Sequence, residues 1–217
     1  WMSRGLGMCI RDRYWIHSGF LTVNGAKMSK SKNNFITTDD MLKTYPGDVF
    51  RMFVLMHHYR SPVDYSTKTM ETAKKHLRDI GAFLERLKTV KGKGQILDLD
   101  IDKTKEDFYA WMDDDFNTPA GLAVIFELMN KVNQNIGSLS KVQAVAVSKF
   151  IKSVLESLGF MSLTSGVPEE IMKLVEEREL LRSNKQFTQS DDLRKRIVEL
   201  GYEVEDTEDG PLVLPKA

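Results

Sequence analysis

The sequence predicts a mainly α-helical protein that has a short strand-containing segment near its start and a small α+β unit at its end. Three observations support this fold class. Apolar residues recur at spacings of three and four over most of the range 66–200, which is the period of amphipathic helices. Short runs rich in strand-forming residues occur only near the two ends, within 15–23 and 202–214. The expected helices are joined by short connections, which is typical of an antiparallel bundle.

Length and composition fit a globular protein of one large or two small domains. The chain has 217 residues, of which 41% are hydrophobic, and no apolar stretch reaches the length of a membrane span. Its first residues do not show the succession of a secretory signal. Cys9 is the single cysteine, so a disulfide framework and a multi-cysteine metal site within this chain are excluded. We therefore expect a cytoplasmic protein that makes no membrane contact.

The net charge is zero, but the charges are unevenly distributed along the chain. Residues 66–94 hold eight basic and three acidic side chains, a net +5, whereas residues 98–127 hold nine acidic and two basic ones, a net −7. A phosphate backbone could lie along the first range and would be repelled by the second. An ordinary mixed-charge surface on two neighbouring helices is the alternative, which charge alone favours.

Residues 1–13 differ from everything that follows them. They show no clean helical or strand period, and the run 8–13 resembles the peptide encoded by a sequencing adapter. We interpret this range as a non-native leader, and a frayed natural terminus is the alternative.

The next part of the chain is expected to contain two short strands followed by two short helices. Asn24-Gly25 is a strong turn dipeptide and ends the second strand. Thr38 and the two aspartates after it cap the first helix, and Pro62 breaks the second. The strands are predicted at 15–17 and 20–23, and the helices at 38–45 and 46–59.

The central part is expected to be an antiparallel bundle of helices with short connections. Ser66 begins a helix of roughly 25 residues, and the flexible basic run 91–94 ends it. Thr118 is suited to cap a later helix, because Pro119 then stands in its first turn. The predicted bundle helices cover 66–90, 103–113, 118–136 and 140–158.

The last part is expected to be a small α+β unit that follows a turn-rich linker at 162–167. Two helices are predicted at 168–184 and 189–200, and Gly201 terminates the second one. The segments 202–205 and 212–214 flank Asp209-Gly210, which predicts a closing hairpin.

A lysine-rich run after the first turn is the sharpest candidate for chemistry. It places two lysines three residues apart, with hydroxyl side chains between and after them. Lysine acts as a mobile point charge, and hydroxyls and backbone amides add hydrogen bonds, so the run suits a polyphosphate. A solvated Lys/Ser loop is the alternative. The run consists of Lys27, Met28, Ser29, Lys30 and Ser31.

The ranges 14–20, 27–31 and 33–37 together resemble the signature region of class I aminoacyl-tRNA synthetases, and most closely that of the cysteine-specific family. In that family the 27–31 equivalent, the KMSKS loop, closes over ATP, which is bound with Mg²⁺. The resemblance implies that Lys27 and Lys30 are catalytic phosphate ligands, and that Lys30 stabilises the leaving pyrophosphate. The family commonly has Ser-Leu-Gly-Asn where this chain has Ser-Lys-Asn-Asn at 31–34.

Two further ranges resemble the same family. The range 57–66 is similar to its stem-contact region, which implies that Arg60 contacts tRNA, and 112–130 is similar to its helical bundle. The histidine pair at 57–58 could suggest a metal site, but adjacent helical residues point about 100° apart and no third ligand is nearby. For the three aspartates at 113–115, a solvated helix end is favoured over a metal site. We expect no metal site in this chain.

The range 174–206 resembles the small anticodon-binding domain of the family. The resemblance implies that Arg182, Asp191 and Arg194 hydrogen-bond to anticodon bases, for which carboxylate and guanidinium groups are suited. Asp191 and Arg194 are three residues apart, so an ordinary intrahelical ion pair is the alternative. The family usually ends with an aromatic residue that stacks on the anticodon, and 210–213 contains none.

The resemblance covers residues 14–217 and implies a division into three parts after the leader. These are the end of a Rossmann-type catalytic domain with the KMSKS loop (14–66), a DALR-like antiparallel helical bundle (67–161) and an α+β anticodon-binding domain (162–217).

The implied function is that of the carboxy-terminal part of a cysteine–tRNA ligase, whose partners are ATP, cysteine and cysteine tRNA. The chain lacks a His-Ile-Gly-His-type motif and the Cys/Cys/His/Glu set that binds the family's zinc. We therefore expect it to be inactive alone. The alternatives are a non-catalytic tRNA-binding module and a mycothiol-type cysteine ligase, and the second is disfavoured because such a ligase needs no anticodon reader.

Overall fold

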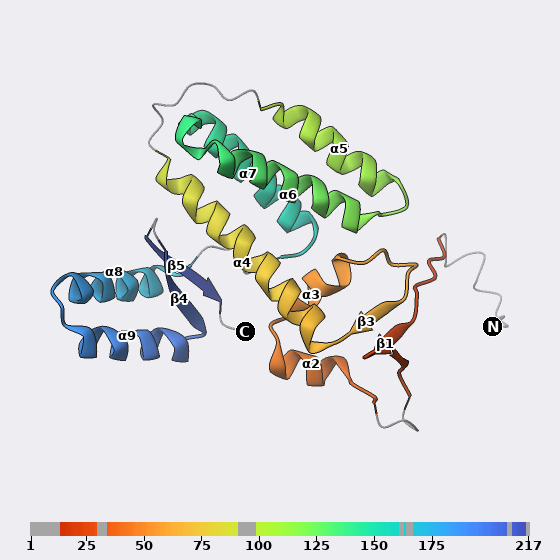
Figure 1. The fold of residues 1–217 in the computed structure, drawn as a ribbon, viewed down its shortest axis with the longest axis horizontal. Coiled ribbons are helices and arrows are strands. Elements are labelled where there is room, and N and C mark those ends of the chain that lie inside the picture. The colour runs from red at the N-terminus through yellow and green to blue at the C-terminus, as the bar shows by residue number, and fades with distance from the viewer. Residues whose placement is uncertain are drawn as a thin grey trace.

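The computed structural model describes residues 14–29, 34–90, 99–160, 163, 167–207 and 210–215. Within these ranges the protein is mainly helical, with one three-stranded sheet near its start and a two-stranded sheet at its end (Figure 1). The predicted mainly α fold class is confirmed. No helix in the described part of the chain is both long and apolar enough to cross a membrane.

The first unit is built on a short sheet of mixed direction. A turn at Asn24 and Gly25, both with positive φ, joins its first two strands into an antiparallel hairpin. The third strand pairs parallel to the first after a connection through two helices, so the strand order is β2-β1-β3. The elements are β1 (Leu21–Val23), β2 (Ala26–Lys27), α2 (Thr38–Thr44), α3 (Gly47–Leu55) and β3 (Val63–Tyr65).

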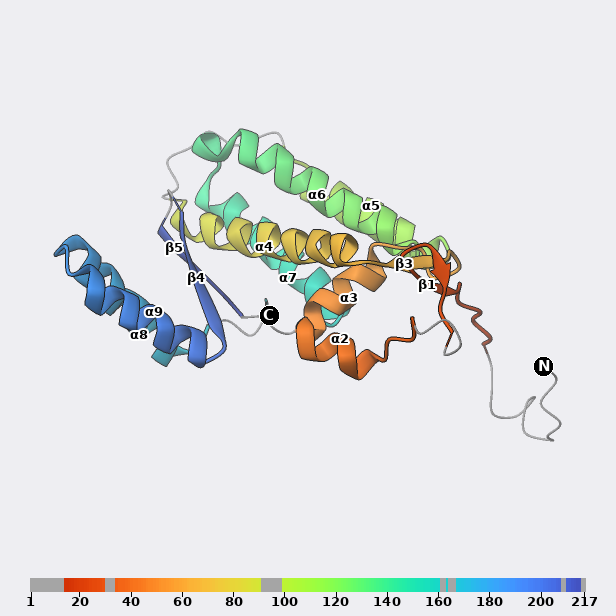
Figure 2. The ribbon, with the colours of Figure 1, turned by 60° about the horizontal axis from the view of Figure 1, so that its bottom comes forward.

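The helical bundle packs along one side of a long helix, α4 (Thr67–Thr89), which begins at a capping box made by Ser66 and Thr69. Its apolar residues recur every three or four positions and are buried on one face. Figure 2 shows α5 and α6 lying along one side of α4. The remaining bundle elements are α5 (Ile101–Asp113), α6 (Thr118–Gln134), the 3₁₀ turn η2 (Ile136–Ser138) and α7 (Lys141–Ser157).

The small terminal unit packs two helices against a hairpin. It consists of α8 (Glu169–Ser183), α9 (Phe187–Glu199), β4 (Tyr202–Thr207) and β5 (Gly210–Pro215). Its core is separate from that of the bundle and includes Ile171, Val175, Ile197, Val204 and Val213. The unit lies beside α4, where β5 contacts the helix and Arg78 Nη2 is 3.5 Å from Glu203 Oε2 (Figure 1).

One continuous core joins the first unit to the bundle. Val49, Met52 and Phe53 of α3 are buried in the same apolar cluster as Met70, Ile80 and other α4 residues. The two units are therefore held together by shared apolar burial, which is roughly proportional in strength to the area removed from water.

The predicted helices are confirmed, with shifts of their ends of up to four residues, the largest at α3, which ends at Leu55 and not at the expected 59. The cap of α6 is Asn117, whose side chain accepts from the Ala120 amide, and not Thr118. The last helix begins at Phe187, two residues before the expected start. The closing hairpin is confirmed, although Asp209 lies outside the described residues.

The prediction of a strand at 15–17 is wrong. That range has no regular structure, and Trp15 and Ile16 are exposed because no described strand pairs with them. The strand β3 was not predicted, since it has only three residues and a carboxylate, Asp64, stands at its centre. The expected flexible run at 91–94 and the leader at 1–13 lie outside the part of the chain that the structure describes. So does the expected linker at 162–167, apart from Leu163 and Val167.

We predict that Phe83→Ala destabilises the fold by about 3–5 kcal/mol, because it removes a fully buried ring from the face of α4. Urea denaturation followed by circular dichroism measures the change. Val142→Ala is the control, since this side chain is 80% exposed, and it should change stability by less than about 0.5 kcal/mol. Equal effects of the two substitutions would contradict the assigned packing.

Candidate functional site

The β1–β2 hairpin leads directly into the lysine-rich loop. Lys27 ends β2 and is exposed, while Met28 and Ser29 are half-buried. Asn34 links the two ends of the loop, since its Oδ1 accepts from the Ser29 amide at 2.9 Å and its Nδ2 donates to the Lys27 carbonyl at 3.2 Å. The loop is therefore closed at its base by one amide side chain. Lys30 and Ser31 lie outside the described residues.

The stem-contact candidate Arg60 is held by an acidic residue from the bundle. Its Nε and Nη2 atoms donate to the two carboxylate oxygens of Asp115 at 2.6 and 3.0 Å. The hydroxyl of Tyr59 donates to Asp115 Oδ1 at 2.6 Å and accepts from Arg60 Nε at 3.0 Å. These hydrogen bonds join the loop before β3 to the turn between α5 and α6. A bidentate pair of this kind fixes orientation as well as adding energy.

The hydrogen bonds of this cluster shift the pKa values of Asp115, Tyr59 and Arg60. The hydrogen bond from Arg60 lowers the pKa of Asp115, and the hydrogen bond to Asp115 raises the pKa of Tyr59. The same carboxylate raises the pKa of Arg60, so the guanidinium stays charged. The cluster therefore remains an ion pair across the neutral pH range.

The three-aspartate run is not simply a solvated helix end. Asp115 and Phe116 both have positive φ, near 55°, and this tight turn directs Asp115 to Arg60. The two residues of the histidine pair contact different groups. His57 Nδ1 lies 2.8 Å from the Phe53 carbonyl oxygen, and His58 Nε2 lies 3.9 Å from Asp115 Oδ2. Among the described residues, no group of three His, Cys, Asp or Glu side chains is arranged to hold a metal ion.

A buried arginine organises the small terminal unit. Arg178 of α8 is fully buried, and its Nη1 and Nη2 atoms donate to the two oxygens of Asp206 on β4 at 2.8 and 3.0 Å. Arg182, one turn later on α8, reaches the same carboxylate at 3.1 Å. The hydrogen bond from Arg178 lowers the pKa of Asp206, and Arg182 and Arg194 lower it further by their charge. One carboxylate thus connects the buried arginine to the exposed one.

The three expected anticodon-contact residues gather around this pair. Arg182 is exposed and bound to Asp206, while Asp191 and Arg194 are exposed on α9. The hydrogen bond to Asp206 is the main cause of the raised pKa of Arg178, and the charge of Asp191 adds a smaller contribution in the same direction. In the described part of the chain, no ion pair joins Asp191 to Arg194, so the intrahelical pair considered above does not form.

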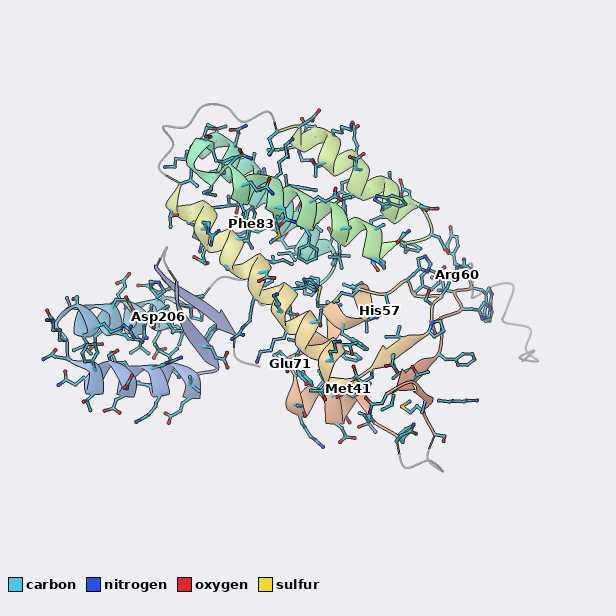
Figure 3. All side chains as sticks on the ribbon, in the orientation of Figure 1. Met41, His57, Arg60, Glu71, Phe83 and Asp206 are labelled. Atoms are coloured by element: carbon cyan, nitrogen blue, oxygen red, sulfur yellow. The ribbon has the colours of Figure 1, made fainter. Side chains whose placement is uncertain are left out.

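Figure 3 labels Arg60 and Asp206 on opposite sides of α4, so the two candidate tRNA-contact regions lie apart. Sequence reasoning missed the structural roles of Arg178, Asp115 and Asp64. A fully buried arginine carries no sequence signal of its own, since arginine is usually exposed. For Arg178, the available hint was its spacing of seven, four and three residues from Ile171, Leu174 and Val175, which places it on the same face of α8.

Two family models match the chain. The model of the tRNA synthetases class I (C) catalytic domain matches residues 6–75, and the model of the DALR domain matches residues 107–162. The first match contains the loop at 27–31 and the Arg60 region. The second contains Asp115 and most of the bundle.

Three curated proteins named cysteine--tRNA ligase are similar to this chain. Those of Thermococcus gammatolerans, Thermococcus onnurineus and Methanococcus vannielii are 38%, 35% and 37% identical to it over 91%, 92% and 89% of the chain. The chain spans only 45%, 46% and 45% of their respective lengths. Among solved structures, the LeuRS–tRNA–LeuAMS ternary complex of Agrobacterium radiobacter K84 matches 70% of this chain and 22% of its own, with a TM-score of 0.49 and 18% identity.

We predict that Asp206→Asn destabilises the small unit by about 1–2 kcal/mol, because it removes the bidentate carboxylate partner of the buried Arg178 guanidinium and leaves Glu179, 2.7 Å from Nη1, as its remaining carboxylate partner. The figure is discounted from that of a fully buried pair because Asp206 itself is 43% exposed. Hydrogen exchange of α8 and β4 amides measures the change, and Asp192→Asn, on the exposed face of α9, is the control.

The same pair predicts a pH dependence with a definite sign. The folded-state pKa of Asp206 is lowered, so its contribution is complete above the unfolded-state pKa of about 3.9 and is lost as the pH falls through the folded-state pKa. The Asp206→Asn variant should lack this acid-dependent loss. If the small unit were equally stable at neutral pH with and without the Asp206→Asn substitution, the role assigned to the pair would be refuted.

Proposed function

Given that the chain belongs to the cysteine–tRNA ligase family and matches the carboxy-terminal half of its members, we propose that it supplies the KMSKS loop and the tRNA-binding part of such a ligase. The proposed reaction joins cysteine to ATP as cysteinyl adenylate, with release of pyrophosphate, and then transfers the cysteinyl group to the terminal ribose of cysteine tRNA. The observation that carries the proposal is the similarity over nine-tenths of the chain. None of the reported matches favours the tRNA-binding module or the mycothiol-type ligase.

Lys27 and Lys30 are the proposed phosphate ligands, and Met28, Ser29 and Ser31 complete the loop that closes over ATP. The exposed position of Lys27 at the end of β2 supports its part in this proposal. Cationic side chains stabilise the negative charge that develops on the phosphates as pyrophosphate leaves. Mg²⁺ would enter as the partner of ATP.

The zinc of the family does not fit the residues of this chain. A multi-cysteine ligand set requires more than one cysteine, and Cys9 is the only one in the sequence. Zinc therefore has no proposed ligand here, and recognition of the cysteine thiol is assigned to a part of the ligase other than this chain.

The small unit is the proposed anticodon reader, with Arg182, Asp191 and Arg194 as the base contacts. Support comes from their grouping around the Arg178–Asp206 pair and from the absence of a mutual ion pair, in the described structure, that would satisfy Asp191 and Arg194. A guanidinium and a carboxylate can read the Watson–Crick edges of unpaired bases. Arg60 is proposed to contact the tRNA inner corner, where a phosphate would compete with Asp115 for the guanidinium.

We further propose the division 14–66, 67–161 and 162–217 for the catalytic end, the bundle and the anticodon-binding domain, after a leader at 1–13. An exposed aromatic and aliphatic segment supports the view that the catalytic end is only part of a larger domain. Tyr14, Trp15, Ile16 and Phe20 are between 58% and 88% exposed. Contiguous apolar exposure of this kind marks an interaction surface. A cytoplasmic setting remains part of the proposal.

We predict that the purified 217-residue chain does not catalyse cysteine-dependent exchange between pyrophosphate and ATP, since the zinc ligands and the second phosphate-binding motif of the family are not among its residues. The assay uses labelled pyrophosphate, ATP, Mg²⁺ and cysteine, with alanine in place of cysteine as the blank. Exchange above that blank would overturn the expectation that this chain is inactive alone.

We predict that Arg194→Ala weakens binding of cysteine tRNA by roughly tenfold and leaves the weaker binding of an unrelated tRNA nearly unchanged, because base contacts discriminate and phosphate contacts do not. Filter binding at fixed salt measures both affinities. Lys195→Ala is the matched control, since Lys195 is the next residue of α9 and pairs with Asp192. An equal loss for both tRNAs would count against base recognition by Arg194.

A further inference from the structure

The side chain of Asp64 connects two strands and the turn that precedes the lysine-rich loop. Its Oδ1 atom accepts from the hydroxyl of Thr22 at 2.7 Å and from the backbone amide of Gly25 at 2.7 Å. Thr22 lies on β1 directly opposite Asp64 in the parallel register, and Gly25 is the second residue of the β1–β2 turn. One carboxylate oxygen therefore fixes both the strand and the turn. Both donors lower the pKa of Asp64, the Thr22 hydroxyl more strongly, so the carboxylate stays ionised.

Two backbone contacts extend this connection on either side. The Asn24 amide donates to the Tyr65 carbonyl at 3.0 Å, so the first turn residue is also bound to β3. The carbonyl of Asp64 accepts from the hydroxyl of Thr69 at 3.2 Å, in the first turn of α4. The hairpin is thus joined through Asp64 to the start of the helix along which the bundle packs.

The position of Lys27 depends on this hairpin. Thr22 pairs with Lys27 in the antiparallel register, so the residue that donates to Asp64 stands opposite the lysine that begins the loop. The two described contacts of Asn34 are with Ser29 and Lys27, so they join residues of the loop to each other and do not reach β3 or α4. The side chain of Asp64 therefore holds the hairpin to β3, and its backbone carbonyl joins β3 to the start of α4.

We propose that Asp64 is a positioning residue, which holds the β1–β2 hairpin against β3 and α4 and thereby sets where Lys27 meets the phosphates of ATP. The proposal rests on the proposed function for its second part, the phosphate contact. Hydrogen bonds to an ionised acceptor are stronger and shorter than those between neutral groups, which suits a carboxylate for this task. A carboxamide at position 64 keeps an oxygen that can accept from the same two donors.

The test compares Asp64→Ala and Asp64→Asn with the unchanged 217-residue chain, all ¹⁵N-labelled. Amide hydrogen exchange reports the hairpin directly. We expect Asp64→Ala to accelerate exchange at Gly25 by about tenfold or more, and Asp64→Asn to stay within about threefold of the original chain. Asp102→Ala is the control, since that carboxylate pairs with Lys105 of its own helix, and it should change nothing at Gly25. The melting temperature and the exchange of α4 amides show whether the fold is intact.

Titration of the same samples with Mg·ATP tests the consequence for Lys27. In the original chain and in Asp64→Asn, the Lys27 amide signal should shift with a similar dissociation constant, which Asp64→Ala should raise by about tenfold. Unchanged exchange at Gly25 in Asp64→Ala would overturn the proposal, as would unchanged Mg·ATP affinity in that variant. If Asp64→Asn behaved like Asp64→Ala in Gly25 exchange or in Mg·ATP affinity, the proposal would also be overturned.

The phosphate-binding role of the loop and the positioning role of Asp64 can be refuted separately. If the Lys27 signal of the original chain does not respond to Mg·ATP while Gly25 exchange still depends on Asp64, the phosphate-binding role of the loop is refuted and the hold of Asp64 on the hairpin stands. If the original chain responds and Asp64→Ala responds equally, the loop function stands and the positioning role is refuted.

Discussion

Burial of one face of α4 is the constraint on which the rest of the structure depends. The helix starts beside β3, passes through the core that α3 and the bundle helices share, and contacts β5 of the small unit. Because its apolar residues recur at helical spacing over 23 residues, the neighbouring elements are fixed relative to one another by packing against it. Lys27 and the Arg178–Asp206 cluster therefore lie at separate places, the first in the unit that shares a core with α4 and the second in the small unit that contacts α4 through β5.

Polar contacts orient particular side chains and the β1–β2 hairpin on this apolar core. Asp64 orients the hairpin, Asp115 holds Arg60, and Asp206 joins Arg178 to Arg182. In each case, one carboxylate connects elements that are distant in sequence. Such contacts contribute little to stability when exposed, but they restrict the orientation of the side chains that they hold. We infer that these three carboxylates position the surfaces that the ligase would present to ATP and tRNA.

Sequence patterns predicted the helices well, because apolar spacing, caps and glycine terminators are local signals. The long helix from Ser66, the short helices before it and the closing hairpin were all predictable on these grounds. The strand β3 was not predictable, since three residues with a central aspartate have no strand signal. The strand at 15–17 was predicted wrongly, because its residues favour strands by composition but are exposed and irregular in the structure. The pairs Asp64–Gly25, Arg60–Asp115 and Arg178–Asp206 could not be predicted, because their members lie 39, 55 and 28 positions apart in the chain.

The central claim is that one chain presents two separate tRNA-contact regions, the small unit and the Arg60 region. Hydroxyl-radical footprinting of cysteine tRNA, free and bound to the 217-residue chain, tests this claim most directly. The account predicts protection of the anticodon loop together with the inner corner of the tRNA, and loss of the inner-corner protection alone in Arg60→Ala. Protection confined to one of the two regions, or spread evenly over the tRNA backbone, would contradict it.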